Sequence, residues 1–283
     1  MTFFPKSNEK SLLNIRVRKQ NRNLNCVKHP REVIAVDTET DDGDIFLIAD
    51  SNGNHLDLDD ITFENVAEFL LHHEGKWIFF YNLSYDADCI LKLIPERILK
   101  SYKWKKELSF TIGDYVIHYI DKKKLTIRKG KHSINCYDIM QYYDRKSLVH
   151  AYEESIKKPL AESYLKTKQD RKIFSKYNYS RNKRQIRNYC IYDCILTKEL
   201  SEYWISTFYD VFGFYPNNWI SAGYLAEKVL INNGIDIPKF NEIQYEFQEI
   251  ARNSFYGGRF ELVQRGYIGE CYLYDLNSAY PFA

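Results

Sequence analysis

Two carboxylates two residues apart, Asp37 and Glu39, follow a short apolar run. The run Val33–Val36 is mostly β-branched, which predicts a buried strand. Side chains two apart in a strand point to the same face, so the two carboxylates would lie side by side at the edge of an apolar core. Like charges held this close are unfavourable unless a cation lies between them, and hard divalent ions such as Mg²⁺ take oxygen ligands. The pair therefore predicts a metal site.

A third carboxylate follows the next apolar run. Trp77–Tyr81 predicts another buried strand, and Asn82, Tyr85 and Asp86 come directly after it. An asparagine amide can bind a phosphate or a sugar, and a tyrosine ring offers a face on which a base stacks. For Asp86 taken alone, the alternative is a helix N-cap, because Asp is favoured at that position.

A fourth carboxylate lies in the predicted helix Arg184–Tyr203. Tyr189 and Asp193 are four residues apart and therefore share one face of this helix. An Asp among apolar residues of a helix interior needs a compensating partner, because helix interiors disfavour it and burial raises its cost. A metal ion would supply that partner. A surface Asp193 paired with Lys198 is the alternative.

Taken in order, these segments predict phosphodiester hydrolysis. Four carboxylates suit two divalent ions about 3.5–4 Å apart, one activating a water with help from Tyr189 and one stabilising the leaving 3′ oxygen. A lysine near the bound phosphate would stabilise transition-state charge, and both Lys166 and Lys168 are candidates. The acids that follow the first pair are assigned to a surface turn and not to the metal: Asp41, Asp42 and Asp44.

Charge is unevenly distributed along the 283 residues, although the net charge is only +2. Residues 1–31 hold eight Lys or Arg and one acid, residues 32–68 hold twelve acids and no Lys or Arg, and residues 157–187 hold eleven Lys or Arg and two acids. An acidic centre between basic segments suits metal chemistry on a polyanion. Ordinary solvated faces are the alternative. The 24 Tyr and 17 Phe predict core packing first, and stacking faces for bases second.

The six cysteines include no Cys-x-x-Cys pair and no Cys/His cluster with zinc-finger spacing, so they predict reduced, buried thiols. The N-terminus has no uninterrupted apolar signal region. No apolar run approaches the roughly 20 residues of a membrane span. We therefore expect a cytoplasmic or cytoplasm-like location, an organellar one if the gene lies on a plasmid, and no membrane partner.

The elements that must position these residues form a mixed α/β pattern. We expect strands at Val33–Val36, Ile45–Ala49, Trp77–Tyr81, Leu108–Ile112, Tyr115–Ile120, Leu125–Arg128, Ser133–Tyr137, Phe255–Val263 and Cys271–Tyr274. We expect helices at Phe63–His73, Asp86–Ile94, Ser147–Ile156, Arg184–Tyr203, Asn217–Asn233 and Glu242–Arg252, with a loop at the start of Asp170–Arg187. The fold class is therefore α/β, with a mixed central sheet flanked by helices.

The order of these motifs resembles the three exonuclease motifs of the DnaQ-like 3′–5′ exonucleases, in the form found in family B DNA polymerases. Phe255–Gly258 resembles the family's Tyr-x-Gly-Gly linker between exonuclease and polymerase domains, and Asp275–Pro281 resembles polymerase motif A. Together they resemble the protein-primed branch of phages, linear plasmids and some other viruses. Residues 1–30 are polar and basic, which indicates an extension. The resemblance spans about Val33 to the end and implies an RNase H-like exonuclease domain over 31–205 and the start of a polymerase domain over 206–283.

The resemblance implies a role for each matched residue. The metal-binding carboxylates would be Asp37, Glu39, Asp86 and Asp193 in the exonuclease site, which would hold two Mg²⁺ or Mn²⁺ ions, and Asp275 in the polymerase site. Tyr189 would orient the water, and Lys168 or Lys166 would be the catalytic lysine. Contacts to DNA would come from Thr40, Asn82, Tyr85, Ser147, Leu148, Tyr256, Gly257 and Gly258, and Tyr280 would lie near the sugar of the incoming nucleotide.

The sequence departs from the family pattern in several places. Ile139 and Met140 stand where the family has a Ser-Leu pair, which Ser147 and Leu148 would replace, and Ala279 replaces the usual Leu of motif A. Nothing matches the Lys-rich motif B or the Tyr-x-Asp-Thr-Asp-Ser motif C, so we expect no primer extension by this chain alone. The implied partners are single-stranded DNA with a primer 3′ end, a terminal priming protein, and a second polypeptide that carries the rest of the polymerase.

Two other functions are compatible with the sequence. One is a non-catalytic DNA-binding or assembly half of a split polymerase. The other is a free-standing nuclease with an RNase H-like core. The complete set of carboxylates, together with Tyr189, favours catalysis over binding alone.

Overall fold

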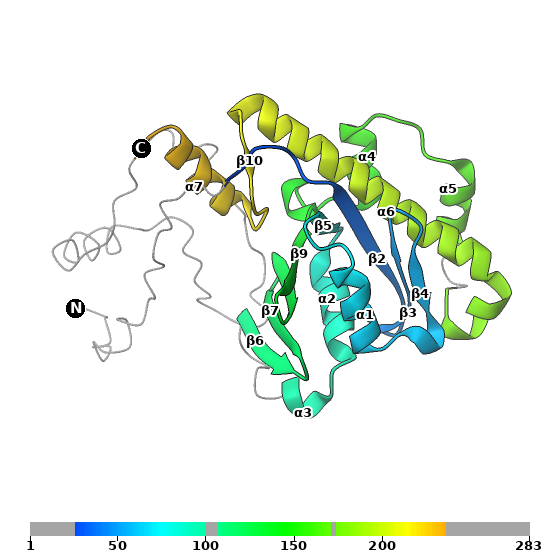
Figure 1. Ribbon diagram of the computed structural model, residues 1–283. Helices are drawn as coiled ribbons and strands as arrows, with labels where there is room; N and C mark the ends of the chain where they lie inside the picture. Colours follow the sequence, from blue (N-terminus) through cyan, green and yellow to red (C-terminus); the bar gives the residue numbers. More distant parts are fainter. Residues whose placement is uncertain (1–25, 100–106, 171–173, 236–283) are drawn as a thin grey trace, which may run out of the picture. The chain divides into compact units, whose positions relative to one another are not determined.

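The computed structural model describes residues 26–99, 107–170 and 174–235. Its centre is a sheet of eight strands, shown in Figure 1. In order across the sheet these are β4 (His55–Asp57), β3 (Asp44–Asp50), β2 (Val33–Asp41), β5 (Trp77–Phe80), β9 (His132–Asp138), β8 (Lys124–Lys129), β7 (Tyr115–Ile120) and β6 (Glu107–Ile112). The fold class is therefore a mixed α/β class, as predicted.

The three central strands run parallel and end at one edge of the sheet. β2 pairs with β5, and β5 pairs with β9, both in parallel register, whereas the outer strands pair antiparallel. A parallel connection needs a crossover, and these crossovers contain helices or further strands. Because the carboxyl ends of parallel strands meet at the same edge, the residues that follow β5 and β9 lie near those at the end of β2.

Helices cover both faces of this sheet. On one face lie α1 (Phe63–Leu71) and α2 (Leu83–Lys92), which pack against Ile34, Val36, Ile78 and Phe80. On the other face runs α6 (Lys176–Phe212), which contacts β2 and β3 and against which α4 (Leu148–Ser155) and α5 (Glu162–Gln169) pack. The remaining elements are β1 (Cys26–Val27), the 3₁₀ turns at Leu58–Asp60 and Met140–Tyr142, α3 (Glu96–Leu99), β10 (Tyr215–Pro216) and α7 (Ala222–Asn232).

The strand alternation decides which residues face which helix. In β2 the even-numbered Ile34 and Val36 point toward α1 and α2, so Thr38 follows them to that side. The odd-numbered Asp37 and Glu39 point the other way, toward α6. The register of β2 against β3 shifts between Glu39 and Thr40, where Phe46 of β3 is the extra residue of a bulge, and the pairing then continues to Asp41.

The segment after α6 returns to the sheet. Gly213 ends α6 in the left-handed conformation, with φ of 74°, which a glycine adopts without strain. Trp219 is fully buried and packs edge-on against Trp77 of β5 and Phe208 of α6. The predicted domain boundary between residues 205 and 206 falls inside α6, and this boundary stays a prediction.

Most predicted strands and helices are confirmed in place and type, with the following corrections. α7 begins at Ala222, five residues after the predicted start at Asn217. α2 begins at Leu83, so Asp86 lies in its first turn and is not its N-cap. α6 begins at Lys176 and is much longer than the predicted helix. The short helix α5 was not predicted, because its sequence is mostly polar. The elements predicted after residue 235 lie outside the described residues.

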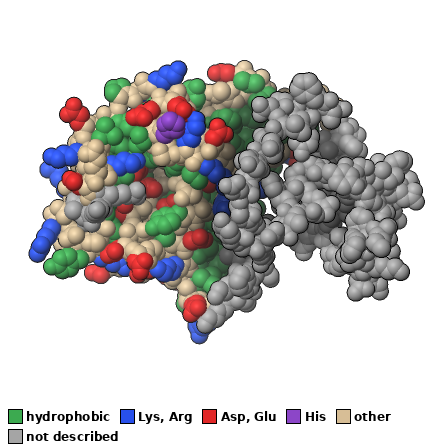
Figure 2. All heavy atoms as spheres, turned by 180° about the vertical axis from the view of Figure 1, so that it is seen from behind, with side chains coloured by type: hydrophobic (Ala, Val, Ile, Leu, Met, Phe, Trp, Pro, Cys, Tyr) green, Lys and Arg blue, Asp and Glu red, His purple; other side chains and the backbone are tan. Residues whose placement is uncertain are grey.

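The acidic and basic segments of the sequence pair with each other in the structure. Asp57 accepts hydrogen bonds from Arg187 and Tyr179 and lies 3.3 Å from the Lys183 ammonium. Lys176 lies 3.5 Å from Asp44. On the face seen in Figure 2, positive and negative side chains lie intermixed. Part of the charge segregation in the sequence therefore serves to attach α6 to the acidic β3–β4 region.

Four of the cysteines are buried free thiols, as predicted: Cys89, Cys136, Cys190 and Cys194. Cys26 is exposed, which corrects the prediction at that position, and Cys271 lies outside the described residues. Among the described helices, none combines the length and the apolar character needed to cross a membrane.

Candidate metal centre

Asp37 and Glu39 lie together on the α6 side of β2, as the sequence spacing predicts. One oxygen from each carboxylate and the Cys190 sulfur of α6 all lie within 4.8 Å of one another. Glu39 is buried, with 3% of its surface exposed, and Asp37 is half-buried. Cys190 Sγ lies 3.6 Å from the Asp37 carbonyl oxygen and 3.9 Å from its Oδ2. Cys190 was not among the predicted site residues.

Asp86 reaches the same edge from the first turn of α2. Its carboxylate is buried and accepts a 2.6 Å hydrogen bond from the Thr38 hydroxyl, which strand alternation directs toward α2. Burial raises the pKa of Asp86 to about 7, although the bond from Thr38 opposes this change. Thr38 was not among the predicted site residues, because the sequence spacing placed it on the opposite face from Asp37 and Glu39.

Asp193 is buried on α6, and its partner comes from a helix that the sequence did not predict. The hydroxyl of Tyr164, on α5, donates a 2.5 Å hydrogen bond to Asp193 Oδ1. The Tyr164 ring stacks on Tyr189, with ring centroids 5.2 Å apart, and Phe174 meets the Tyr189 ring edge-on. Asp193 is therefore not the exposed residue, paired with Lys198, that was the alternative.

The carboxylates of Asp86, Asp193 and Glu39 all act on Asp37. The pKa of Asp37 lies well above its usual value, first because the protein encloses its carboxylate and then because Asp86 and Asp193 are close; Glu39 adds a smaller increase. Three buried acids and the half-buried Asp37 in such repulsion need a compensating positive charge. Carboxylate oxygens are the ligands that Mg²⁺ and Mn²⁺ prefer, so the donor set fits a hard divalent cation. Burial raises the pKa of the Cys190 thiol as well, which keeps it protonated and a poor ligand for such an ion.

The structure distinguishes between the two candidate lysines. Lys168 is half-buried, and its ammonium lies 3.4 Å from the Tyr164 hydroxyl oxygen and 5.5 Å from the centre of that ring. Lys166 is exposed on the same helix. Lys168 therefore lies one hydrogen bond away from the partner of Asp193, which favours it as the lysine of the site.

The turn between β5 and α2 is fixed by a carboxylate that was not among the predicted site residues. Asn82 has a left-handed backbone, with φ of 69°, and its N–H donates to Asp138 Oδ1 at 3.1 Å. The same oxygen accepts the Met140 N–H at 2.9 Å. Asp138 is the last residue of β9, so a carboxylate at the end of an apolar run, the signal used for Asp37, could have found it. Burial raises its pKa to about 6 despite these bonds.

The predicted DNA-binding residues fall into two groups. Thr40 and Tyr85 are joined by a hydrogen bond between their hydroxyls, and 48% of the Tyr85 surface is exposed. Ser147 instead caps α4, accepting the His150 N–H, and Leu148 packs in an apolar cluster with residues of α5 and α6. The remaining predicted residues lie outside the described residues: Tyr256, Gly257, Gly258, Asp275 and Tyr280.

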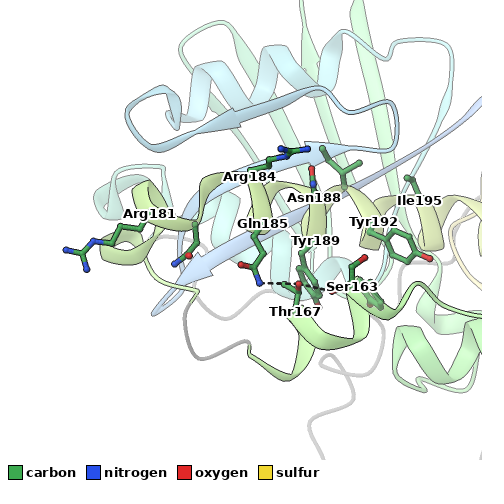
Figure 3. Close-up of a pocket in the computed structure, with 12 residues that line it drawn as sticks. Ser163, Thr167, Arg181, Arg184, Gln185, Asn188, Tyr189, Tyr192 and Ile195 are labelled. Carbon is green, nitrogen blue, oxygen red and sulfur yellow. Dashed lines mark hydrogen bonds between the residues drawn. The ribbon is translucent and has the colours of Figure 1, made fainter.

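A cavity of about 700 Å³ lies between α5 and α6, beside the residues around Asp193. Its wall includes Tyr164 and Tyr189, and it also holds Arg184 and Asn188. Figure 3 shows Gln185 of α6 pointing to Thr167 of α5, with a hydrogen bond of 3.3 Å between them. The cavity thus opens beside the aromatic residues that contact Asp193.

Comparison with known proteins gives one match. A protein family described as DNA polymerase type B, organellar and viral, matches residues 68–283, which is about three quarters of the chain. The matched range includes Asp86, Asp138 and Asp193 and begins after Asp37 and Glu39. Searches of curated proteins and of solved structures gave no match. The chain therefore belongs to the family B DNA polymerases of the organellar and viral type.

Proposed function

We propose that the described region is the proofreading part of a protein-primed family B DNA polymerase, a metal-dependent 3′–5′ exonuclease with an RNase H-like core. The observation that carries the proposal is the convergence of four carboxylates, from β2, α2 and α6, into one cluster whose mutual repulsion raises the pKa of Asp37. Two Mg²⁺ or Mn²⁺ ions would be held by Asp37, Glu39, Asp86 and Asp193. When bound, such ions activate a water and stabilise the leaving oxygen.

The other residues would hold the DNA and orient the reacting groups. Tyr85 is exposed and tied to Thr40, so its ring offers a stacking face for the terminal base. Asn82 presents its amide from a turn that Asp138 holds in place. Lys168 would place positive charge near the scissile phosphate, where charge develops in the transition state. Tyr189 would orient the water.

The direction of degradation tests the proposal. The purified chain is incubated with single-stranded DNA labelled at the 3′ end, and separately at the 5′ end, with Mg²⁺ or Mn²⁺. We expect the 3′ label to leave at once as a mononucleotide, while the 5′-labelled strand shortens step by step. Internal cleavage would instead indicate a free-standing nuclease of another type. Binding of the DNA without degradation would contradict the proposal and favour the non-catalytic binding module.

We further propose that the priming protein and a second polypeptide act on this chain as partners in DNA synthesis. The segment around Asp275, which is similar to polymerase motif A, supports a task shared with DNA synthesis.

The acidity of the carboxylates predicts how Mg²⁺ affects stability. The raised pKa values of Asp86, about 7, and Asp138, about 6, mean that the folded protein binds more protons than the unfolded chain between roughly pH 4 and pH 7. Stability contributed by these protonated groups is lost as the pH rises through those values. Acids with a lowered pKa, such as Asp50 and Asp57, are ionised in both the folded and the unfolded state over most of this pH range. They therefore do not alter how the stability changes with pH there.

Mg²⁺ should therefore raise the melting temperature more at pH 8 than at pH 5.5, because at pH 5.5 it must displace protons. At a concentration 100 times its dissociation constant the gain is about 2.7 kcal/mol. Differential scanning fluorimetry with K⁺ at matched ionic strength provides the control. An equal Mg²⁺ effect at the two pH values would contradict the assignment of Asp86 to the metal site.

A further inference from the structure

Tyr164 is the residue through which α5 enters the carboxylate cluster. Only Tyr164 and Thr167 are buried among the eight residues of this helix, and Tyr164 keeps just 3% of its surface exposed. A large phenol in a short, otherwise polar helix is commonly there for packing alone. Its contacts, however, go to both α6 residues of the third sequence motif.

The hydroxyl and the ring of Tyr164 make separate contacts. The hydroxyl donates to Asp193 Oδ1 at 2.5 Å, inside a buried environment where such a bond is strong. The ring lies nearly parallel to Tyr189, at an interplanar angle of 10°, and 4.6 Å from the ring of Tyr192. Lys168 approaches the phenol oxygen at 3.4 Å. One side chain thus touches a carboxylate of the cluster and the tyrosine one turn before it.

A hydrogen bond to one carboxylate oxygen fixes the plane of that carboxylate. A bound ion requires its ligands in a defined orientation, and outer partners of this kind set it. The parallel stack fixes the Tyr189 ring in the same way. Lys168, by donating to the phenol oxygen, directs the phenol proton toward Asp193. The Lys168 ammonium, the Tyr164 hydroxyl and the Asp193 carboxylate therefore form a continuous hydrogen-bonded chain from α5 to the carboxylates.

We propose that Tyr164 is a positioning residue of the metal centre, fixing the Asp193 carboxylate with its hydroxyl and the Tyr189 ring with its own ring. This inference rests on the proposed function for its biological meaning, but it can be measured through metal binding alone. It adds a second residue of α5 to the site, beside the lysines Lys166 and Lys168 that the sequence indicated in this segment.

The hydroxyl can be removed without displacing α5. Thr167 donates to the Ser163 carbonyl at 2.9 Å and accepts from Gln185 of α6 at 3.3 Å, as Figure 3 shows. The Ala161 N–H donates to the Tyr192 hydroxyl at 3.1 Å. The bonds from Gln185 and to Tyr192 attach α5 to α6 independently of the phenol. Tyr164→Phe therefore keeps the ring stack and loses the two bonds of the phenol oxygen, the one to Asp193 and the one from Lys168.

Tyr152 of α4 provides a matched control. It lies in the same apolar cluster, is 4% exposed, and donates its hydroxyl to Glu199 Oε2 at 2.8 Å. Tyr152→Phe therefore removes an equivalent phenol–carboxylate bond that does not involve the four carboxylates. Any general effect of losing such a bond in this cluster will appear in both variants.

The experiment measures Mn²⁺ binding by electron paramagnetic resonance of free Mn²⁺ and, in parallel, DNA degradation. Tyr164→Phe should weaken Mn²⁺ binding about tenfold to a hundredfold, the range seen when outer partners of metal ligands are removed. It should lower kcat at limiting Mn²⁺ without changing KM for DNA, with recovery at high Mn²⁺. Tyr152→Phe should bind Mn²⁺ as the parent chain does.

Wild-type Mn²⁺ affinity in Tyr164→Phe, or an equal loss in both variants, would overturn the proposal and leave Tyr164 a packing residue. If the parent chain binds Mn²⁺ but degrades no DNA, the proposed function fails while the role of Tyr164 is still decided by the binding data. If the parent chain binds no Mn²⁺, both fail.

Discussion

Asparagine in place of Asp37 should abolish DNA degradation and, in the metal-free protein, raise the stability of the fold. The activity should fall on the order of 10³-fold or more, because residues of one catalytic unit fail together when any member is lost. The stability should rise by roughly 1–3 kcal/mol, because the change removes a buried charge that Asp86 and Asp193 repel. Gain of stability with loss of function is the expected mark of a site built from like charges.

Asp42→Asn is the matched control for this prediction. Asp42 is exposed, in the turn that follows β2, and has a left-handed backbone with φ of 51°, which asparagine also tolerates. It undergoes the same chemical change five positions along the chain. Degradation of labelled single-stranded DNA and urea unfolding with chelator measure both effects. Retained activity in Asp37→Asn, or a similar loss in Asp42→Asn, would contradict the metal site.

Alanine in place of Trp219 should cost about 3–5 kcal/mol of unfolding free energy, the range for losing a large buried aromatic side chain. Trp219 is fully buried, and its ring centroid lies 5.5 Å from those of both Trp77 and Phe208. The surrounding aromatic rings are held by a strand and a long helix, so they cannot collapse into the space left behind. Urea denaturation followed by circular dichroism measures the loss.

Val211→Ala provides the comparison, because Val211 is an apolar residue at the end of α6 with 66% of its surface exposed. Its cost should stay within about 0.5 kcal/mol. A small effect of Trp219→Ala on the unfolding of the sheet would indicate that residues 213–232 fold separately, with a boundary near residue 205. A large effect places that boundary after α7.

The sequence was most informative where a buried strand ends in a polar residue. The pattern was sufficient to select Asp37, Glu39 and Asp86, because strand alternation is local and because a carboxylate next to an apolar run is costly. Asp138 fits the same rule, although the family motif at this point concerns the next two residues, Ile139 and Met140. The order of the eight strands in the sheet could not be predicted from the sequence, since it depends on contacts between residues far apart in the chain.

Two other features of the site could not be derived from local patterns. α5 is polar along most of its length, so neither the helix nor the role of Tyr164 shows in the hydrophobic periodicity. Cys190 reaches Asp37 because of the angle at which α6 crosses β2, and tertiary packing sets that angle. Helical spacing did place Tyr189 and Asp193 on one side of α6, where Tyr164 contacts both.

The length of α6 has a mechanical consequence. From Asp193 to Phe208 the helix contains no non-helical residue, and its one irregular position, Asn182, lies before both. This interval spans about 22 Å at 1.5 Å per residue. A helix of this kind transmits a tilt or a shift along its axis with little loss, since bending would break hydrogen bonds. A displacement of the aromatic residues around Trp219 would therefore shift α6 as a rigid body and change the position of Asp193 at the other end of this interval.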